Sequence, residues 1–332
     1  MATAADIGEY GTTLAVLRAH GDNPSAFLAL NEGNRHFSTP GIDGVIAYRA
    51  AGRYLLQFGG PFATSGDRPE LLRRFVDHAA GQRRRVVALQ LQAADAMLYA
   101  GHGFAVNQLG ASYALDLSTF TLRGSRFMRL RNKISRAERS GLRVVETTPA
   151  AYADQIAAID RQWLRSKGWH VKELDFLIGQ LGGRAQEHRR LFVGLLGEEP
   201  VAYISYSPAF GSRPGWLHDL SRRRPGVPPG VMEAINVHAI TAFQESGAAW
   251  LHFGFTPFTA LDRDLATPTA SPTVERFVRF LATHGDKVYP ARTQVAYKEK
   301  WGPRVVLPEY LAFHGRPSPG AIWTVLRVTR SI

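Results

Sequence analysis

The sequence predicts a mixed protein of the α/β or α+β class with two domains, and three observations lead to this fold class. The chain has 332 residues, which is enough for two domains of ordinary size that each bury a core. Hydrophobic residues make up 45% of the chain and charged residues 20%, a balance that is typical of folded proteins and argues against disorder. Strand patterns and helix patterns alternate through both halves of the sequence.

The N-terminal half is predicted to begin with a hairpin, because two apolar runs flank a short segment that contains Gly52. Leu71 and Phe75 then recur at helical spacing, and Gly101 is placed to end a later, shorter helix. The expected order is strand, strand, helix, strand and helix, at residues 45–48, 54–58, 69–82, 86–91 and 94–100.

The second half repeats this rhythm, with an amphipathic helix, three strands, a helix that ends before Gly247, and a further strand. These elements are expected at residues 152–167, 191–196, 201–206, 216–220, 231–246 and 250–253. Helix, three antiparallel strands, helix and strand is similar to the order of an acetyltransferase-like (GNAT) core. The patterns alone give an α/β or α+β protein with two domains, and the family resemblance described below implies that these are two tandem GNAT-like domains. We expect them in residues 1–125 and 146–332, joined by a basic connecting helix in residues 126–145.

Composition narrows the function classes. The formal charge is +12 and arginine dominates the cations, which favours a polyanionic partner such as RNA or an anionic membrane face. A GC-rich coding bias and a merely basic soluble enzyme are the alternatives. Because the chain has no cysteine, cysteine nucleophiles, thiolate zinc sites and disulfides are excluded. The histidines lack the i, i+4 pairs of a helical zinc motif, so no metal is expected.

The amino terminus and the hydropathy pattern predict a cytoplasmic protein. Residues 1–9 lack the basic start and the apolar run of a signal peptide. No run of about eighteen apolar residues occurs, so no transmembrane segment is expected. Peripheral contact with an anionic membrane stays open because of the positive charge.

The connecting helix carries cations at spacings of three, four and three residues, so that they share one helical face: Arg126, Arg129, Lys133 and Arg136. Arg139 follows three residues later. Leu130, Ile134 and Ala137 form a neighbouring apolar face that can anchor the helix to a core. A row of cations on an anchored helix can follow a phosphate backbone, and the alternative is a solvated basic face without a partner.

A candidate anion-facing site lies where the strand at 216–220 meets a Pro/Gly-rich basic loop and the next helix. Exposed amides at a helix N-terminus, flanked by arginines such as Arg222, favour a phosphate or a developing oxyanion. Asp219 at the strand end and Glu233 in the first helical turn add carboxylates for proton transfer or amine binding. The alternatives are a structural ion pair between Asp219 and Arg222 and a dipole-complementing role for Glu233.

Lys298 and Lys300 follow a strand-like segment at 293–297, and alternation then places both lysines on one face. A lysine kept in an arginine-dominated chain indicates a need for a compact ammonium group.

The loop at 222–230 also indicates whether coenzyme A could be the acyl donor of a transferase. Arg223 and Gly226 fit the start of a coenzyme A pyrophosphate loop, but proline stands at 225, 228 and 229 and supplies no amide donor. This pattern argues against coenzyme A.

The two site segments, residues 219–233 and 297–303, resemble the cytosolic catalytic domain of the bacterial aminoacyl-phosphatidylglycerol synthases, the multiple peptide resistance factor (DUF2156-like) family. In that family an Asp-Leu-x-Arg-Arg run leads to Gly-Val-Met-Glu, and an aromatic-Lys-x-Lys-aromatic-x-Pro run follows later. Further similar segments lie at residues 43–48, 58–61, 103–104, 109–110, 116–124, 130–142 and 172–179. The resemblance implies the tandem GNAT-like fold and an aminoacyl-tRNA co-substrate without another cofactor. It also implies that Lys298 is the functional lysine, which meets the leaving hydroxyl or its adjacent phosphate.

We therefore predict an aminoacyl-tRNA-dependent transferase, with catalytic roles for Asp219, Arg222, Glu233 and Lys298 and with either carboxylate as the base. The predicted tRNA-binding residues are Arg126, Arg129, Arg131, Lys133, Arg136, Arg139, Arg223 and Lys300. The expected acceptor is a soluble small molecule such as a natural-product intermediate, because the membrane portion of the lipid-modifying relatives is missing from this chain. The alternatives are a peripheral phosphatidylglycerol transferase, a coenzyme A-dependent N-acyltransferase, and a non-catalytic basic protein that binds RNA or membranes.

Overall fold

Eleven strands form a single mixed sheet in the computed structural model, which describes residues 4–167, 175–284 and 291–330. Their order across the sheet is β1-β2-β3-β4-β11-β5-β10-β9-β8-β7-β6. The strands are β1 (Arg35–Thr39), β2 (Ile42–Ala51), β3 (Tyr54–Ala63), β4 (Arg85–Leu91), β5 (Phe104–Asp116), β6 (Leu142–Thr147), β7 (Arg190–Leu196), β8 (Glu199–Ala209), β9 (Gly215–Arg223), β10 (Trp250–Pro257) and β11 (Val305–His314).

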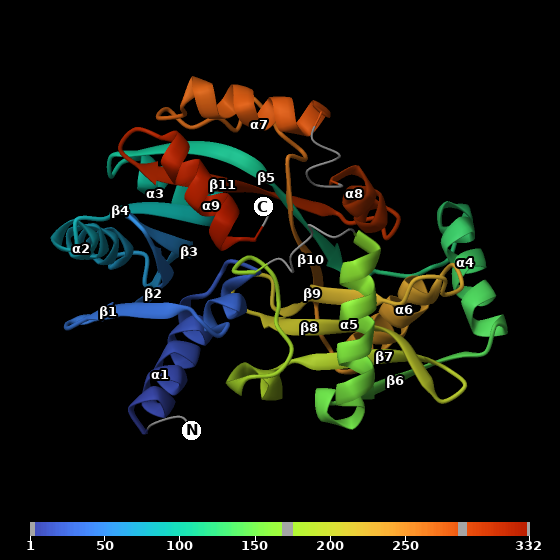
Figure 1. Ribbon diagram of the computed structural model, residues 1–332. Coiled ribbons are helices and arrows are strands. Elements are labelled where there is room, and N and C mark those ends of the chain that lie inside the picture. Colours follow the sequence, from blue (N-terminus) through green and yellow to red (C-terminus); the bar gives the residue numbers. More distant parts are fainter. Residues whose placement is uncertain (1–3, 168–174, 285–290, 331–332) are drawn as a thin grey trace.

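Helices cover both faces of this sheet (Figure 1). They are α1 (Ala4–His20), α2 (Arg68–Gly81), α3 (Ala93–Ala100), α4 (Met128–Arg139), α5 (Ala153–Lys167), α6 (Val231–Glu245), α7 (Pro272–His284), α8 (Ala291–Glu299) and α9 (Pro319–Val328). Short 3₁₀ turns are η1 (Ala26–Leu30), η2 (Ser125–Phe127), η3 (Pro149–Tyr152) and η4 (Arg184–His188). In the N-terminal half, α2 and α3 share one core with the sheet, while α1, α7 and α9 share another.

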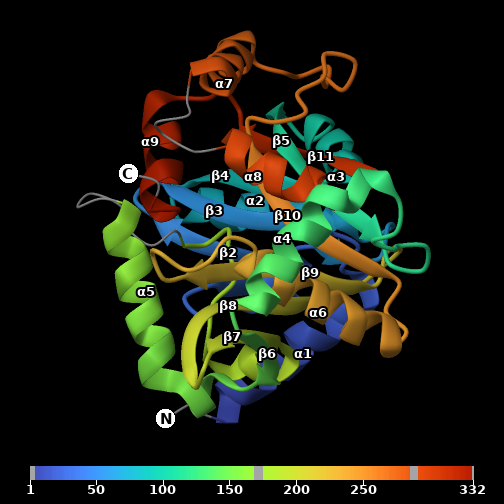
Figure 2. The same ribbon diagram turned by 90° about the vertical axis from the view of Figure 1, so that its right-hand side faces the viewer.

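The second half of the sheet is covered in the same two-sided way. Helices α4 and α6 pack over one face, where Ile134 and Ile235 join a common core with Phe192. Helix α5 packs over the other face through Ile156 and Ile159. Figure 2, turned by 90°, shows α5 and α6 on either side of the strands β7, β8 and β9.

Two features of the sheet place the candidate site. Strands β9 and β10 run parallel but pair only over residues 215–217 and 250–252, after which β10 pairs with β5 alone. Strands β3 and β4 form the equivalent parallel pair in the N-terminal half. Strand β11, near the end of the chain, lies between β4 and β5 and so ties the C-terminal segment to the first half.

The mixed α/β class predicted from the sequence is confirmed, as are the strands and helices expected at residues 45–100 and 152–253. The connecting helix expected over residues 126–145 is shorter: α4 ends at Arg139, and strand β6 begins at Leu142 after Gly141, which has a positive φ. The domain bounds stay a prediction. The strand expected at 293–297 is wrong: the segment is helix α8, in which Ala291, Val295 and Lys298 face inward at helical spacing. Residues 172–174 of the family-like segment at 172–179, and residues 1–3 of the terminus, lie outside the described residues.

Candidate active site

A β-bulge in β9 places Asp219. Leu220 pairs with Ser205 and His218 pairs with Tyr206, so Asp219 is the extra residue between two paired positions. A bulge re-aims the side chain that it carries. The bulge lies directly beyond the point where β9 and β10 diverge, so Asp219 sits beside the opening in the sheet.

The carboxylate of Asp219 is almost completely enclosed, with 1% of the side chain exposed. Ser207 Oγ donates a hydrogen bond to Asp219 Oδ2, and Arg189 Nε lies 3.9 Å from the same oxygen. Asp219 Oδ1 has no hydrogen-bond partner among the described residues. Burial raises the pKa of Asp219 to about 6, although the Arg189 guanidinium and the Ser207 hydroxyl both act to lower it. A carboxyl group with this pKa can take up or release a proton near neutral pH.

Gly179 lies directly against the Asp219 carboxylate. A methyl group at position 179 would lie 2.4 Å from Asp219 Cγ and 2.5 Å from Oδ2, far inside van der Waals contact. The Gly179 amide also donates to the Asp219 carbonyl oxygen at 3.3 Å. Only glycine therefore allows this chain segment to lie so close to the carboxylate.

The N-terminal half supplies part of the same site. Arg189 Nη2 donates to Asn31 Oδ1 at 2.8 Å, and Asn31 Nδ2 donates to the carbonyl of Ile178 at 2.8 Å. The Arg189 guanidinium also stacks on the Phe27 ring, 5.3 Å from its centroid. The Arg189 guanidinium is thus held by Phe27 of η1 and by Asn31, the residue after η1, which in turn bonds the segment that contains Gly179.

Arg222 has separate partners. Its Nε lies 3.7 Å from Asp160 Oδ1 of α5, and its guanidinium lies over the Trp163 ring, 3.9 Å from the centroid. The hydroxyl of Tyr203 donates to Asp160 at 2.5 Å. Within the described residues Asp219 and Arg222 do not pair with each other, so the alternative of a local ion pair between them is wrong: each is bonded to groups from distant segments.

Glu233 and Lys300 form a direct ion pair at the start of α6. Lys300 Nζ donates to Glu233 Oε1 at 2.6 Å, and Lys133 Nζ of α4 lies 3.8 Å from the same oxygen. Burial alone would raise the pKa of Glu233, but the two ammonium groups outweigh it and leave that pKa lowered. Glu233 is therefore held as a carboxylate, and Lys300 also stacks on the Tyr297 ring at 3.8 Å.

The N-terminus of α6 is covered by α4 and is not the open anion cradle that the sequence suggests. Gly230 precedes the helix with φ of +98°, and a methyl group there would lie 2.0 Å from the carbonyl oxygen of Lys133. This close backbone approach requires glycine for both reasons. The expected amide site is thus occupied by the connecting helix.

Lys298 lies at the edge of β10 where that strand leaves β9. Its Nζ donates to the Gly254 carbonyl at 2.7 Å and to Thr256 Oγ1 at 2.5 Å, and 5% of the residue is exposed. Burial lowers the pKa of Lys298 to about 7, while the carboxylate of Glu309 acts to raise it. Because α8 is a helix, Lys298 and Lys300 point to different partners, which corrects the expectation of a shared face.

The predicted catalytic residues therefore lie around the diverging strands but on two faces of the sheet. His218 contacts the rings of Tyr206 and Tyr297 on the α6 face, whereas its neighbour Asp219 contacts Ser207 on the opposite face. Glu233 belongs to the α6 side and Asp219 to the other. Both sets of residues lie near the point where β9 and β10 stop pairing.

The basic residues of the connecting segment differ in accessibility. Arg131 is half-buried and donates to the carbonyls of Leu122 at 2.5 Å and Gly124 at 2.7 Å, so it fixes the chain before α4. The remaining cations of the predicted tRNA-binding set are exposed, apart from half-buried Lys300: Arg126, Arg129, Lys133, Arg136, Arg139 and Arg223. Leu130, Ile134 and Ala137 are buried against the core, so the predicted anchoring of the helix is confirmed.

Sequence reasoning missed the groups that surround the predicted residues: Gly179, Arg189, Ser207, Asn31, Asp160 and Glu309. Only Gly179 had a signal, as part of the family-like segment. Within the described ranges, no three His, Asp or Glu side chains gather as metal ligands. Over those same residues, no helix has both the length and the apolar character that crossing a bilayer requires.

Comparisons with known proteins agree on one family. The family pattern described as "Phosphatidylglycerol lysyltransferase, C-terminal" matches residues 14–313. The phosphatidylglycerol lysyltransferase of Bacillus subtilis is 26% identical over 324 residues, which cover 96% of this chain. The chain spans 36% of the length of that relative.

Two solved structures share the fold. The C-terminal domain (DUF2156) of a putative lysylphosphatidylglycerol synthetase from Agrobacterium fabrum superposes with a TM-score of 0.79 at 20% identity, covering 98% of both chains. The L-PGS structure from Bacillus licheniformis gives a TM-score of 0.75 at 23% identity, covering 96% of both chains. With the family pattern matched across most of its length, this chain belongs to the phosphatidylglycerol lysyltransferase C-terminal family.

Proposed function

We propose that this chain transfers an aminoacyl group from aminoacyl-tRNA to the lipid phosphatidylglycerol. The observation that carries the proposal is the buried Asp219 beside diverging strands, in a chain whose family is named for phosphatidylglycerol lysyltransferases. The names of these relatives favour the lipid over the soluble acceptor that the sequence alone suggested.

The reaction is a transesterification and needs no redox step. A glycerol hydroxyl of the lipid headgroup attacks the carbonyl carbon of the aminoacyl ester, and the bond from that carbon to the tRNA ribose oxygen breaks. The proton of the attacking hydroxyl ends on the ribose oxygen. Because the ester is already activated, catalysis requires positioning, a base and charge stabilisation.

Asp219 is the better base of the two carboxylates. Its pKa of about 6 leaves it able to exchange a proton near neutral pH, and its free Oδ1 has no partner among the described residues. Glu233 is already paired with Lys300 and has a lowered pKa, which suits a residue that orders α4, α6 and the lysine.

Two cations complete the proposed mechanism. Lys298 lies at the gap between β9 and β10 with a pKa near 7, so it can donate a proton to the leaving ribose oxygen or offset its charge. Arg222 forms an ion pair with Asp160 and a cation–π contact with Trp163, both on α5. These contacts support a role in which Arg222 fixes the end of β9 and so helps to position Asp219. The exposed cations of α4 supply a surface for the acceptor stem of tRNA.

The test measures radiolabelled lipid product from amino acid, synthetases, total tRNA and phosphatidylglycerol vesicles. Asp219→Asn should lower the rate at least about a hundredfold, the scale for losing a positioned proton-transfer group. Glu245→Gln, which neutralises an exposed carboxylate at the end of α6, is the matched control and should leave the rate unchanged. Full activity of Asp219→Asn would contradict the assignment of the base. Product made only from acyl-coenzyme A, or only on a soluble acceptor, would contradict the proposed function.

A further inference from the structure

Exposed aromatic side chains gather on one part of the N-terminal half. Of the seven large hydrophobic side chains that are exposed in the described residues, four lie on α7, α9 and the loop before α7: Leu265, Phe277, Phe280 and Trp323. Phe277 is 42% exposed, Phe280 58% and Trp323 60%. Single exposed apolar residues need no explanation, but a concentration of this kind marks a contact surface.

Helix α7 has apolar residues on both of its sides. Val274 and Val278 face inward and join the core that also includes Ala321 of α9. Phe277 and Phe280, three residues apart, share the outward face. A helix on the surface of a water-soluble domain normally carries polar residues there, so the outward aromatic pair is unexplained by folding. Figures 1 and 2 show α7 and α9 as neighbours over the same half of the sheet.

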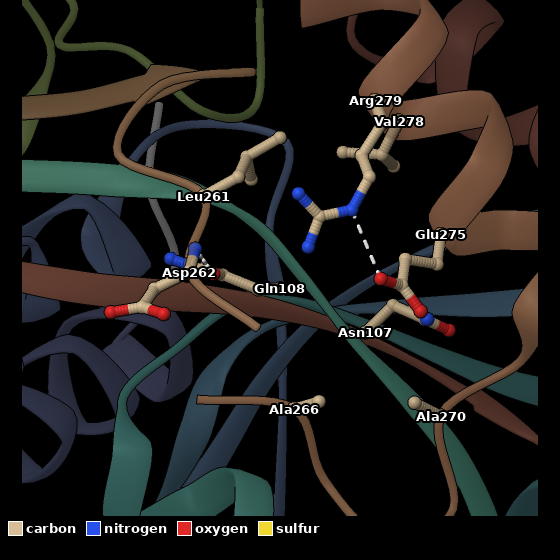
Figure 3. Close-up of a pocket in the computed structure, with 9 residues that line it drawn as sticks. All are labelled: Asn107, Gln108, Leu261, Asp262, Ala266, Ala270, Glu275, Val278 and Arg279. Atoms are coloured by element: carbon tan, nitrogen blue, oxygen red, sulfur yellow. Dashed lines mark hydrogen bonds and ion pairs between the residues drawn. The ribbon is translucent and has the colours of Figure 1, made fainter. Parts of the chain in front are cut away.

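The aromatic face of α7 is held firmly in place. Asn107 of β5 exchanges two hydrogen bonds of 3.1 Å with the backbone of Ser271, the residue before α7. Gln108 donates to the Ala260 carbonyl at 2.8 Å and accepts from the Asp262 amide at 2.8 Å. Figure 3 shows these two β5 residues below α7, around a cavity of about 20 Å³, room for a single water molecule. These hydrogen bonds fix the start of α7 and the loop before it to β5.

Charge identifies what this surface fits. Exposed Arg276 precedes Phe277, and exposed Arg327 lies one helical turn after Trp323. The segments of this surface, residues 260–284 and 315–330, together hold six arginines and three acids, so the arginines outnumber the acids. A second copy of the chain would bring these cations against each other. An anionic lipid surface accepts both the aromatic rings and the arginines.

We propose that α7 and α9 form a docking face for an anionic bilayer, with Phe277, Phe280 and Trp323 entering the interfacial region and the arginines contacting lipid headgroups. The biological role of this docking face rests on the proposed function, because an enzyme with a lipid acceptor must reach that lipid at a bilayer. Docking itself requires neither tRNA nor turnover, so it can be measured separately.

The experiment is flotation of the purified chain with vesicles of phosphatidylglycerol and phosphatidylcholine in equal parts, or of phosphatidylcholine alone. The wild type should bind the mixed vesicles, bind the neutral ones at least tenfold less, and release as salt is raised. A Phe277→Ser, Phe280→Ser and Trp323→Ser triple variant should bind mixed vesicles at least tenfold less. Met97→Ser is the control, since Met97 is 59% exposed on α3, on the opposite face of the sheet, and it should bind as the wild type does.

Equal vesicle binding by the triple variant and the wild type would overturn the docking face, as would equal binding to neutral and anionic vesicles. Light scattering tests the alternative of a second copy. If the wild type is dimeric, and the triple variant is monomeric but binds vesicles as before, the face belongs to a dimer interface and the proposal is overturned. Loss of vesicle binding in the triple variant supports docking even if no aminoacyl lipid is formed by the wild type. In that case the proposed function fails alone. A folded triple variant is verified by a melting temperature close to that of the control.

Discussion

Replacing Gly179 by alanine tests the site without touching any ionisable group. The new methyl group would lie 2.4 Å from Asp219 Cγ, whereas ordinary contacts begin at 3.4 Å. Either the carboxylate or the segment around residue 179 must therefore move by about 1 Å. Ser207 and Arg189 hold the carboxylate on its other side, so such a shift breaks the arrangement that sets its pKa. A misplacement of about 1 Å at a reacting group costs about a hundredfold in rate.

The assay is the rate of aminoacyl transfer to phosphatidylglycerol vesicles under single-turnover conditions, together with thermal unfolding of each variant. Gly66→Ala is the matched control, because Gly66 is exposed, has an ordinary backbone conformation and has nothing within 4 Å of the added methyl group. We expect Gly179→Ala to lose about a hundredfold in rate and Gly66→Ala to lose none. A folded Gly179→Ala protein with a normal rate would refute the placement of the reaction at Asp219.

Two further predictions concern the cations. If the exposed residues of α4 contact tRNA phosphates, each alanine substitution at Arg129, Lys133, Arg136 or Arg139 should reduce the slope of log affinity for tRNA against log salt concentration by somewhat under one unit. The reduction should be equal for different tRNAs. Unchanged slopes in the quadruple variant would exclude α4 as a tRNA-binding surface. For Lys298, the pKa is about 7 in the folded chain and about 10.4 when unfolded, so between these pH values the unfolded chain binds more protons and the free energy of unfolding rises with pH. Burial also lowers the pKa of Lys300, which contributes a rise of the same sign in both proteins. Urea unfolding should therefore show a rise that is larger in the wild type than in Lys298→Met, by up to about 5 kcal/mol; parallel pH profiles for the two proteins would show that Lys298 is not held as described.

The strands and helices with strong periodicity were predictable from the sequence. The sequence also predicted Asp219 as a candidate acid, but placed it at the end of a strand, whereas β9 continues to Arg223 and Asp219 lies in a bulge within it. The segment 293–297 shows why the rest was harder. Its alternation of Thr293, Val295 and Tyr297 fits a strand, yet the same residues also place Ala291, Val295 and Lys298 on one side of a helix. Packing against β10 stabilises the helix. This contact joins residues that are far apart in the sequence, so the local pattern of residues 293–297 cannot predict it.

The surroundings of the site depend on contacts between distant segments. Lys300 reaches Glu233 across 67 residues, and Arg189 reaches Asn31 across 158. The bulge that aims Asp219 is a property of the register between β8 and β9 and not of the residues near Asp219 alone. The strand order is equally non-local, since β11 pairs between β4 and β5. Sequence patterns report local periodicity, so they identify the chemical groups but not their partners.

The proposed reaction uses aminoacyl-tRNA as the donor and phosphatidylglycerol as the acceptor. The most direct measurement supplies labelled amino acid, synthetases, total tRNA and phosphatidylglycerol vesicles, and compares the lipid fraction with that of a parallel tube treated with ribonuclease. We predict labelled lipid in the first tube and none in the second, with no product when acyl-coenzyme A replaces the tRNA. Labelled lipid that survives ribonuclease, or a product that requires acyl-coenzyme A, would contradict the account.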